Sequence, residues 1–166
     1  MPKQPITKEK LVPPTAILDG QPRPLMSTAV VLTRHGGPEA LEVRQWEVAP
    51  PGPHELRVRV EAAGISFADL LICQGLHPER RRTPHVPGWD VVGVVESVGA
   101  EVAGVSVGER AASLPIVGGW AEYAVVPGAW VVPVPATLAP TTAICLVFDY
   151  VVAYQMFLRL VADGCW

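Results

Sequence analysis

Histidine and cysteine side chains are the residues of this chain that could bind a metal ion, because they are the usual ligands of zinc. The chain has four histidines and three cysteines, and only Cys73, His77 and His85 lie within a dozen residues of one another. No CxxC pair occurs, and the fourth ligand that a structural zinc site needs cannot be placed from the sequence. We therefore expect no zinc site, and interpret these residues as one buried thiol and two loop imidazoles.

Motifs for two other kinds of chemistry are also missing. The sequence contains neither a nucleophile elbow of the form GxSxG nor a phosphate-binding P-loop. The glycines at Gly88, Gly93, Gly99, Gly104 and Gly108 do not match the dinucleotide fingerprint GxGxxG. They lie among predicted strands, with no helix whose N–H groups could face a phosphate. We interpret them as turns and close backbone approaches in a β-structure.

Length and composition limit the kind of protein that this chain can be. It has 166 residues, 49% of them hydrophobic, and a formal net charge of -3. This is room for one ordinary domain with enough apolar surface to fold. The largest basic cluster is Arg80-Arg81-Arg82, so we expect no binding to nucleic acid.

Two further features bear on where the chain works. The best candidate for a membrane helix, from Ala143 to Tyr154, is interrupted by Asp149 and falls short of the ~18 consecutive apolar residues that such a helix needs. We therefore expect no membrane segment. The cysteines are an odd number at wide spacing, which favours free thiols in a reducing cytoplasm.

Residues 1–26 differ in composition from the rest of the chain. All the lysines and six of the 18 prolines lie before Leu25. We predict that residues 1–26 are a disordered arm or a misassigned extension. Met26 begins the patterned part of the chain and is a candidate start codon.

Strand patterns dominate from residue 27 to residue 140. Leu56, Val58 and Val60 alternate with three charged residues, Arg57 among them, as in a strand with one face on a core and the other in water. Similar short runs, separated by proline and glycine turns, predict further strands. These runs are Ala29 to Thr33, Leu41 to Val48, Val91 to Val98, Gly119 to Val126 and Trp130 to Val134. We therefore predict a mainly β fold, a partly open barrel over residues 27–140.

Two segments break the strand pattern. Residues 67–74 predict a short helix, and residues 141–162 predict one or two helices after a series of prolines. The second segment is rich in large apolar residues, more than one barrel can bury. We predict that it exposes an apolar face, which would promote self-association or binding of a protein partner.

Several motifs occur in an order and at a spacing that are specific for one family. They are His35-Gly36-Gly37-Pro38-Glu39-Ala40-Leu41, Glu61-Ala62-Ala63-Gly64-Ile65-Ser66-Phe67-Ala68-Asp69-Leu70, Val86-Pro87-Gly88-Trp89-Asp90-Val91-Val92-Gly93, Val107-Gly108-Glu109-Arg110 and Gly119-Trp120-Ala121-Glu122-Tyr123. With them, the segment from Ser27 to Gly164 resembles the N-terminal, GroES-like domain of the medium-chain dehydrogenase/reductase family, in its zinc-independent, quinone-oxidoreductase-like branch. The resemblance implies a GroES-like barrel over residues 27–140 and connecting helices over residues 141–166.

The same resemblance bears on the metal. Zinc-dependent alcohol dehydrogenases of this family hold a catalytic zinc with Cys, His and Cys, at positions that correspond here to Ser66, Trp89 and Phe148. None of these three side chains can ligate zinc as the family does. The resemblance therefore implies the metal-free branch, with NADPH as cofactor. Its reaction is hydride transfer to a small-molecule quinone or to an activated carbon–carbon double bond.

The chain departs from that branch at three positions. Ser66 stands where the branch commonly has Asn, Val152 where it has Thr, and His77 where it has Tyr. Serine can still donate a hydrogen bond, whereas valine cannot. The resemblance assigns these site residues: catalytic, Ser66 and Phe67; substrate-binding, His77, Trp89 and Tyr154; cofactor-binding, Val152.

The C-terminal end leaves two functions open. Family members continue from the equivalent of Asp163-Gly164 into a Rossmann domain, which binds the dinucleotide, whereas this sequence stops at Trp166. We expect essentially no catalysis by the chain alone, because hydride transfer needs donor and acceptor held together. One function is the N-terminal half of an NADPH-dependent oxidoreductase, with a Rossmann-domain partner or a homo-oligomer formed through residues 141–162. The other is a non-enzymatic β-barrel interaction module, or a relic of truncation.

Overall fold

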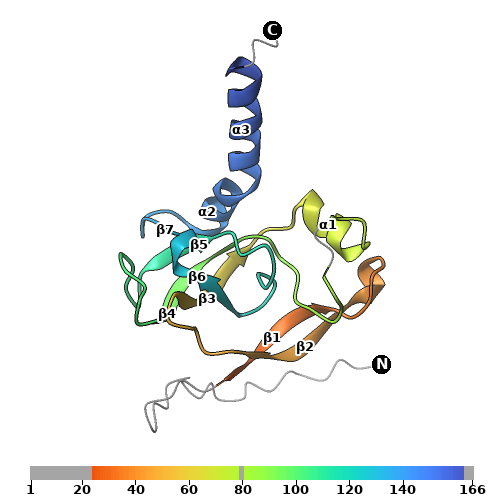
Figure 1. The fold of residues 1–166 in the computed structure, drawn as a ribbon, viewed down its shortest axis with the longest axis horizontal. Coiled ribbons are helices and arrows are strands. Elements are labelled where there is room, and N and C mark those ends of the chain that lie inside the picture. The colour runs from red at the N-terminus through yellow and green to blue at the C-terminus, as the bar shows by residue number, and fades with distance from the viewer. Residues whose placement is uncertain (1–23, 79–80, 163–166) are drawn as a thin grey trace, which may run out of the picture.

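The computed structural model describes residues 24–78 and 81–162 (Figure 1). Most of the predicted N-terminal arm, Arg80 and the last four residues lie outside these ranges. Within them the chain forms two antiparallel sheets and three α-helices. The predicted mainly β class is confirmed, and the two sheets do not close into a complete barrel.

The first sheet is a hairpin of β1 (Leu25–Leu32) and β2 (Leu41–Val48), joined through the short 3-10 helix Pro38–Ala40. β2 has the predicted bounds. β1 begins at Leu25 and not at the predicted Ala29, because its first residues pair with the end of β2. Two isolated bridges connect β1 to the segments before β4 and before β6.

The second sheet has five antiparallel strands in the order β6-β3-β4-β5-β7. Their bounds are Glu55–Ala63 (β3), Val91–Val98 (β4), Arg110–Ser113 (β5), Tyr123–Pro127 (β6) and Val131–Pro133 (β7). β4 has the predicted bounds, while β6 and β7 are shorter than predicted. β5 is not among the predicted strands, because its four residues show no alternation and contain alanines, which are poor strand formers. Pairing with β4 on one side and β7 on the other stabilises it.

Gly93 lets β3 and β4 approach closely in the middle of the second sheet. A Cβ atom on residue 93 would overlap the carbonyl oxygen of Arg59 and lie 2.7 Å from Cγ1 of Val58. Gly104 and Gly108 instead have φ angles of 80° and 91°, as glycines in turns often do. The interpretation of these glycines as close approaches and turns is confirmed.

The core of the second sheet is built from apolar side chains of β3, β4 and β6, and it corrects one prediction. The largest of them are Leu56, Val58, Val91, Val95 and Val126. The prediction that Arg57 lies on a water-facing side of β3 is wrong, since the residue is only 8% exposed. Its Nε donates to Oε2 of Glu96 on β4 at 2.6 Å. A neighbouring strand that supplies a carboxylate makes the buried charge tolerable.

The helices follow the predicted segments. α1 (Phe67–Cys73) comes after β3, and α2 (Pro140–Val147) and α3 (Asp149–Ala162) come after β7. α2 packs on the second sheet through Ala143 and Ile144. α3 projects away from the sheets (Figure 1), and none of its residues is buried.

The predicted exposed apolar face on residues 141–162 is confirmed. Its large apolar side chains are Leu146, Tyr150, Val151, Val152, Tyr154, Met156, Phe157, Leu158, Leu160 and Val161. Pro140–Ala162 is also long and apolar enough to cross a membrane, with a mean hydropathy of 1.7 over an 18-residue window. The sequence analysis expected no membrane segment because Asp149 interrupts the run of apolar residues. A mean hydropathy gives the other result, because it tolerates single charged residues such as Asp149 and Arg159. Buried core helices of soluble proteins meet the same criterion, whereas none of this window is buried.

We expect the chain to self-associate through α3, because exposed apolar patches of this kind form interfaces. Replacing Met156 and Leu160, which are 61% and 48% exposed, by lysine should shift the sedimentation coefficient toward that of a monomer. Val43→Lys, at a 72% exposed position of β2, is the control and should leave it unchanged. A monomeric parent chain that gives no ANS fluorescence at high concentration would contradict the prediction.

Candidate active site

The ring of Trp89 contacts the rings of His77 and Phe148. Its ring centroid is 5.4 Å from that of His77, with the planes at 71°, and 5.4 Å from that of Phe148, with the planes at 36°. These residues come from the loop after α1, the segment before β4 and the junction of α2 and α3. We call His77, Trp89 and Phe148 the aromatic cluster. The Trp89 Nε1 atom is buried without a hydrogen-bond partner among the described residues.

Ser66 is the N-cap residue of α1, and its hydroxyl is used within the chain. Its Oγ and its main-chain N–H each donate to Oδ2 of Asp69 at 2.8 Å. The N–H of Asp69 donates back to Ser66 Oγ at 3.3 Å, which completes a capping box. A hydrogen bond from Ser66 to a substrate would require its hydroxyl to leave Asp69. The adjacent Phe67 is 74% exposed, and the catalytic roles of both residues stay predictions.

Asp90, which follows Trp89 in the sequence, carries a buried carboxyl group, with 4% of the residue exposed. Its Oδ1 accepts from the N–H of Gly64 at 3.0 Å, and Nε1 of Trp120 donates to the carbonyl of Gly64 at 2.8 Å. Burial raises the pKa of Asp90 to about 6; the Gly64 hydrogen bond opposes this, and the negative charges of Asp69 and Asp149 add to it. A carboxyl group with this pKa exchanges a proton near neutral pH.

The other two predicted site residues lie on α3, outside the aromatic cluster. Val152 is 38% exposed and Tyr154 is 55% exposed. The N–H of Val152 donates to the carbonyl of Phe148 at 2.9 Å, a main-chain bond that leaves its side chain at the surface. Cofactor binding by Val152 and substrate binding by Tyr154 therefore stay predictions.

The residues considered as zinc ligands have other environments. Cys73 is buried, and burial raises the pKa of its thiol. His85 Nδ1 lies 3.3 Å from the carbonyl oxygen of Arg82, and burial lowers the pKa of this imidazole. His77 belongs to the aromatic cluster. Among the described residues, no three His, Cys, Asp or Glu side chains form a group that could hold a metal ion.

A separate set of residues lines an apolar pocket of about 390 Å³. Residues of β5, β7, α2 and α3 and of the segment before α2 line it, Ala112, Val132, Leu138 and Leu146 among them. None of the aromatic cluster, Ser66 or Asp90 takes part in it. We place the candidate site at the aromatic cluster, because rings from three separate segments meet there and Asp90, whose pKa is raised, follows Trp89 in the chain.

Asp69 and Asp90 are site residues that the sequence analysis did not single out. Both occur inside the family motifs, where the sequence offered one usable signal. Asp90 stands directly before the apolar run of β4, and acidic residues are rarely buried unless they have partners. An acidic residue in such a position indicates a local role.

Comparison with known proteins places this arrangement in a family. Residues 52–136 match the alcohol dehydrogenase GroES-like domain. Over 132 residues the chain is 33% identical to the mouse synaptic vesicle membrane protein VAT-1 homolog-like. The matched region covers 80% of this chain and 32% of that protein. Over 134 residues it is 34% identical to the quinone oxidoreductase of Lama guanicoe, and this region covers 79% of this chain and 40% of that protein.

Solved structures agree with the sequence comparison. The quinone oxidoreductase of Thermus thermophilus, whose structure is also known as a complex with NADPH, is 36% identical and superposes with a TM-score of 0.69. The match covers 81% of this chain and 41% of that one. The chain thus spans less than half the length of these relatives. It belongs to the alcohol dehydrogenase GroES-like domain family, among the quinone-oxidoreductase-like medium-chain dehydrogenases/reductases.

Proposed function

We propose that this chain is the N-terminal catalytic domain of an NADPH-dependent oxidoreductase that reduces a quinone or an activated carbon–carbon double bond without zinc. The observation that carries the proposal is the contact between Trp89 and Phe148, at two positions that correspond to zinc ligands in the zinc-dependent branch. Indole and phenyl rings do not ligate zinc. They offer flat apolar faces on which a quinone ring can stack. At the third position, Ser66 is held in the capping box.

NADPH would supply the hydride in this reaction. The residues near the site suit its nicotinamide ring, because the aromatic cluster and the side chain of Val152 are flat or apolar. They do not suit its phosphates, since the carboxylate of Asp69 occupies the N-terminus of α1 and would repel a phosphate. We propose that a Rossmann domain, contacting residues 141–162, binds the phosphates.

The test is a chimera in which this chain is joined to the part of the Thermus thermophilus quinone oxidoreductase that it does not cover. We expect the chimera to oxidise NADPH with benzoquinone at least about tenfold faster than the chain alone, because the second domain holds donor and acceptor together. Phenanthroline, which removes zinc, should leave the rate unchanged. The measurement is the loss of NADPH absorbance.

Two variants serve as readout and control for the chimera. Trp89→Ala should raise the KM for benzoquinone, whereas Trp130→Ala, outside the aromatic cluster, should not. A folded chimera that oxidises no NADPH, or one that phenanthroline inactivates, would refute the proposed function.

A second function, from another class, is an interaction module without catalysis. The exposed apolar side chains of α3 favour it. This function predicts an inactive chimera and a chain that binds a protein partner through α3. The free thiols of Cys73 and Cys145 suit a cytoplasmic location in either case.

A further inference from the structure

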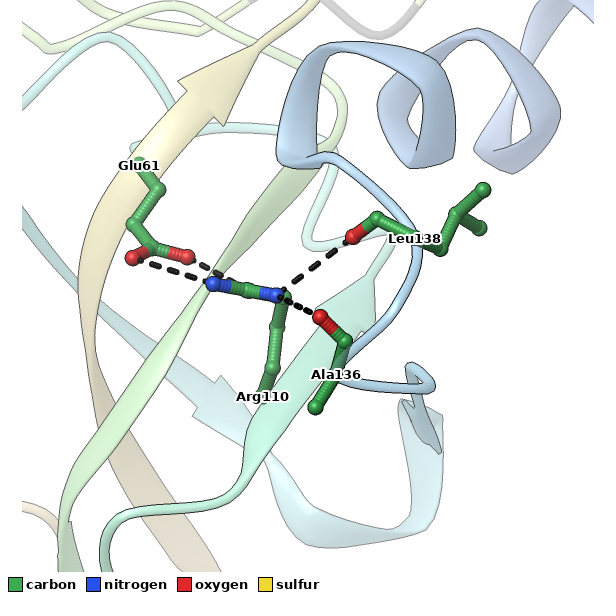
Figure 2. A network of polar contacts seen from close by, with 4 residues as sticks. All are labelled: Glu61, Arg110, Ala136 and Leu138. Atoms are coloured by element: carbon green, nitrogen blue, oxygen red, sulfur yellow. Dashed lines mark hydrogen bonds and ion pairs between the residues drawn. The ribbon is translucent and has the colours of Figure 1, made fainter.

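Arg110 connects the second sheet to the segment that leads into α2 (Figure 2). Its Nε donates to Oε2 of Glu61 on β3 at 2.7 Å, and its Nη2 donates to Oε1 at 3.5 Å. On the other side, Nη1 donates to the carbonyl oxygens of Ala136 and Leu138 at 3.3 and 3.4 Å. The main chain adds a further bond, from the N–H of Val134 to the carbonyl of Arg110 at 2.9 Å. One residue thus joins β3 and β5 to the connection before α2.

The chemistry of this network requires arginine. A planar guanidinium group has donors in a fixed fork, so it can bond a carboxylate and two carbonyl groups at once, which an ammonium group cannot do in this geometry. The hydrogen bond with Glu61 raises the pKa of Arg110, which favours the charged form. Both side chains are partly exposed, at 22% and 23%, and ion pairs at the surface add little stability. The network is therefore better suited to fixing a direction than to stabilising the fold.

The segment that Arg110 holds leads to the candidate site. It continues into α2 and α3, and Phe148 lies between these two helices. The Phe148 ring contacts Trp89, which comes from the segment before β4. Because α3 extends freely from this junction, a small rotation of α2 would move the far end of α3 by a large distance (Figure 1).

We propose that Arg110 and Glu61 form a clamp that sets the direction in which α2 and α3 leave the sheet, and thereby keeps Phe148 against Trp89. Arg110 is a positioning residue in this scheme, since it acts through the helices and touches no reacting group. The direction of α3 is a property of the chain itself. Only the effect of that direction on the rate of NADPH oxidation rests on the proposed function.

Single-molecule FRET tests the direction of α3 at picomolar concentrations, at which chains do not associate. Dyes are attached to Val43→Cys on β2 and Met156→Cys on α3, both exposed positions, in a chain with Cys145→Ser and Cys165→Ser. We expect one narrow FRET distribution for this labelled chain. Arg110→Met should broaden and shift the distribution, and Arg110→Lys should give an intermediate result because lysine keeps the charge but lacks the fork.

Two further variants make the result decisive. Glu61→Gln keeps the side-chain volume and weakens the charge-assisted bonds, so it should also broaden the distribution. Arg59→Met, at an exposed arginine of β3, is the matched control and should leave it unchanged. Circular dichroism checks the fold of each variant. If Arg110→Met does not fold, Glu61→Gln decides; an unchanged distribution in the folded variants would overturn the clamp.

Turnover gives a second readout. In the active chimera, Arg110→Met should lower kcat at least about tenfold while changing the KM for NADPH little, because misplacement of a positioning element costs rate. Because a partly unfolded variant would also show a lower kcat at unchanged KM, the rate is divided by the folded fraction that circular dichroism gives for each variant. If the unsubstituted chimera is inactive, the proposed function fails, while the FRET comparison still decides on the clamp.

Discussion

Gly93→Ala is expected to lower the free energy of unfolding by about 3 kcal/mol, because the new methyl group overpacks a main-chain contact that no rotamer change can relieve. The added Cβ would overlap the carbonyl oxygen of Arg59 and lie 2.7 Å from Cγ1 of Val58. β3 and β4 would have to separate where both contribute to the core. β3 leads to Ser66 and β4 follows Trp89, so we expect the site to be disturbed as well. Urea unfolding followed by circular dichroism measures the loss.

Gly52→Ala is the matched control for this prediction. A Cβ atom on residue 52 would meet the carboxylate of Glu55, with Oε2 at 3.2 Å, and this flexible end of a side chain can move aside. The cost should therefore stay below about 1 kcal/mol. Equal unfolding midpoints for the two variants would show that the approach of β3 and β4 is not as tight as the structure has it.

Asp90→Asn is expected to raise the free energy of unfolding at pH 8 by about 1–2 kcal/mol and to change it little at pH 4. Burial raises the pKa of Asp90 from 3.8 to about 6 in the folded chain. A group with a raised folded-state pKa contributes stability that is fully present below about pH 4 and is lost as the pH rises through about 6. One pKa unit corresponds to about 1.4 kcal/mol, and solvent screening of the exposed Asp149 charge reduces the effect.

The measurement is urea unfolding of parent and variant at both pH values. Asn is a close isostere of the protonated carboxyl group and can accept the same hydrogen bond from Gly64. Glu47→Gln, at an exposed residue of β2 that is not among the groups acting on Asp90, is the control and should leave the free energy of unfolding nearly unchanged at both pH values. A stability difference between parent and Asp90→Asn that is the same at pH 4 and pH 8 would contradict the assignment of a raised pKa to Asp90.

Local patterns were sufficient for most of the strands and helices. β2 and β4 have their predicted bounds because alternating or continuous apolar residues end at clear turn residues. β5 could not be predicted, since its short Arg-Ala-Ala-Ser segment becomes a strand only through its neighbours. The burial of Arg57 escaped prediction for a similar reason, because the carboxylate that pairs with it lies on β4.

The sequence by itself determined the mainly β class, the family and the apolar character of residues 141–162, because motif order and residue type express these properties locally. The tertiary structure alone decided which side chains meet. It brought together the aromatic cluster, buried Asp90 against Gly64, and placed Arg110 between Glu61 and the segment before α2. Such contacts join residues that are far apart in the chain. They depend on strand register and on the directions in which helices leave the sheet, which no local pattern encodes.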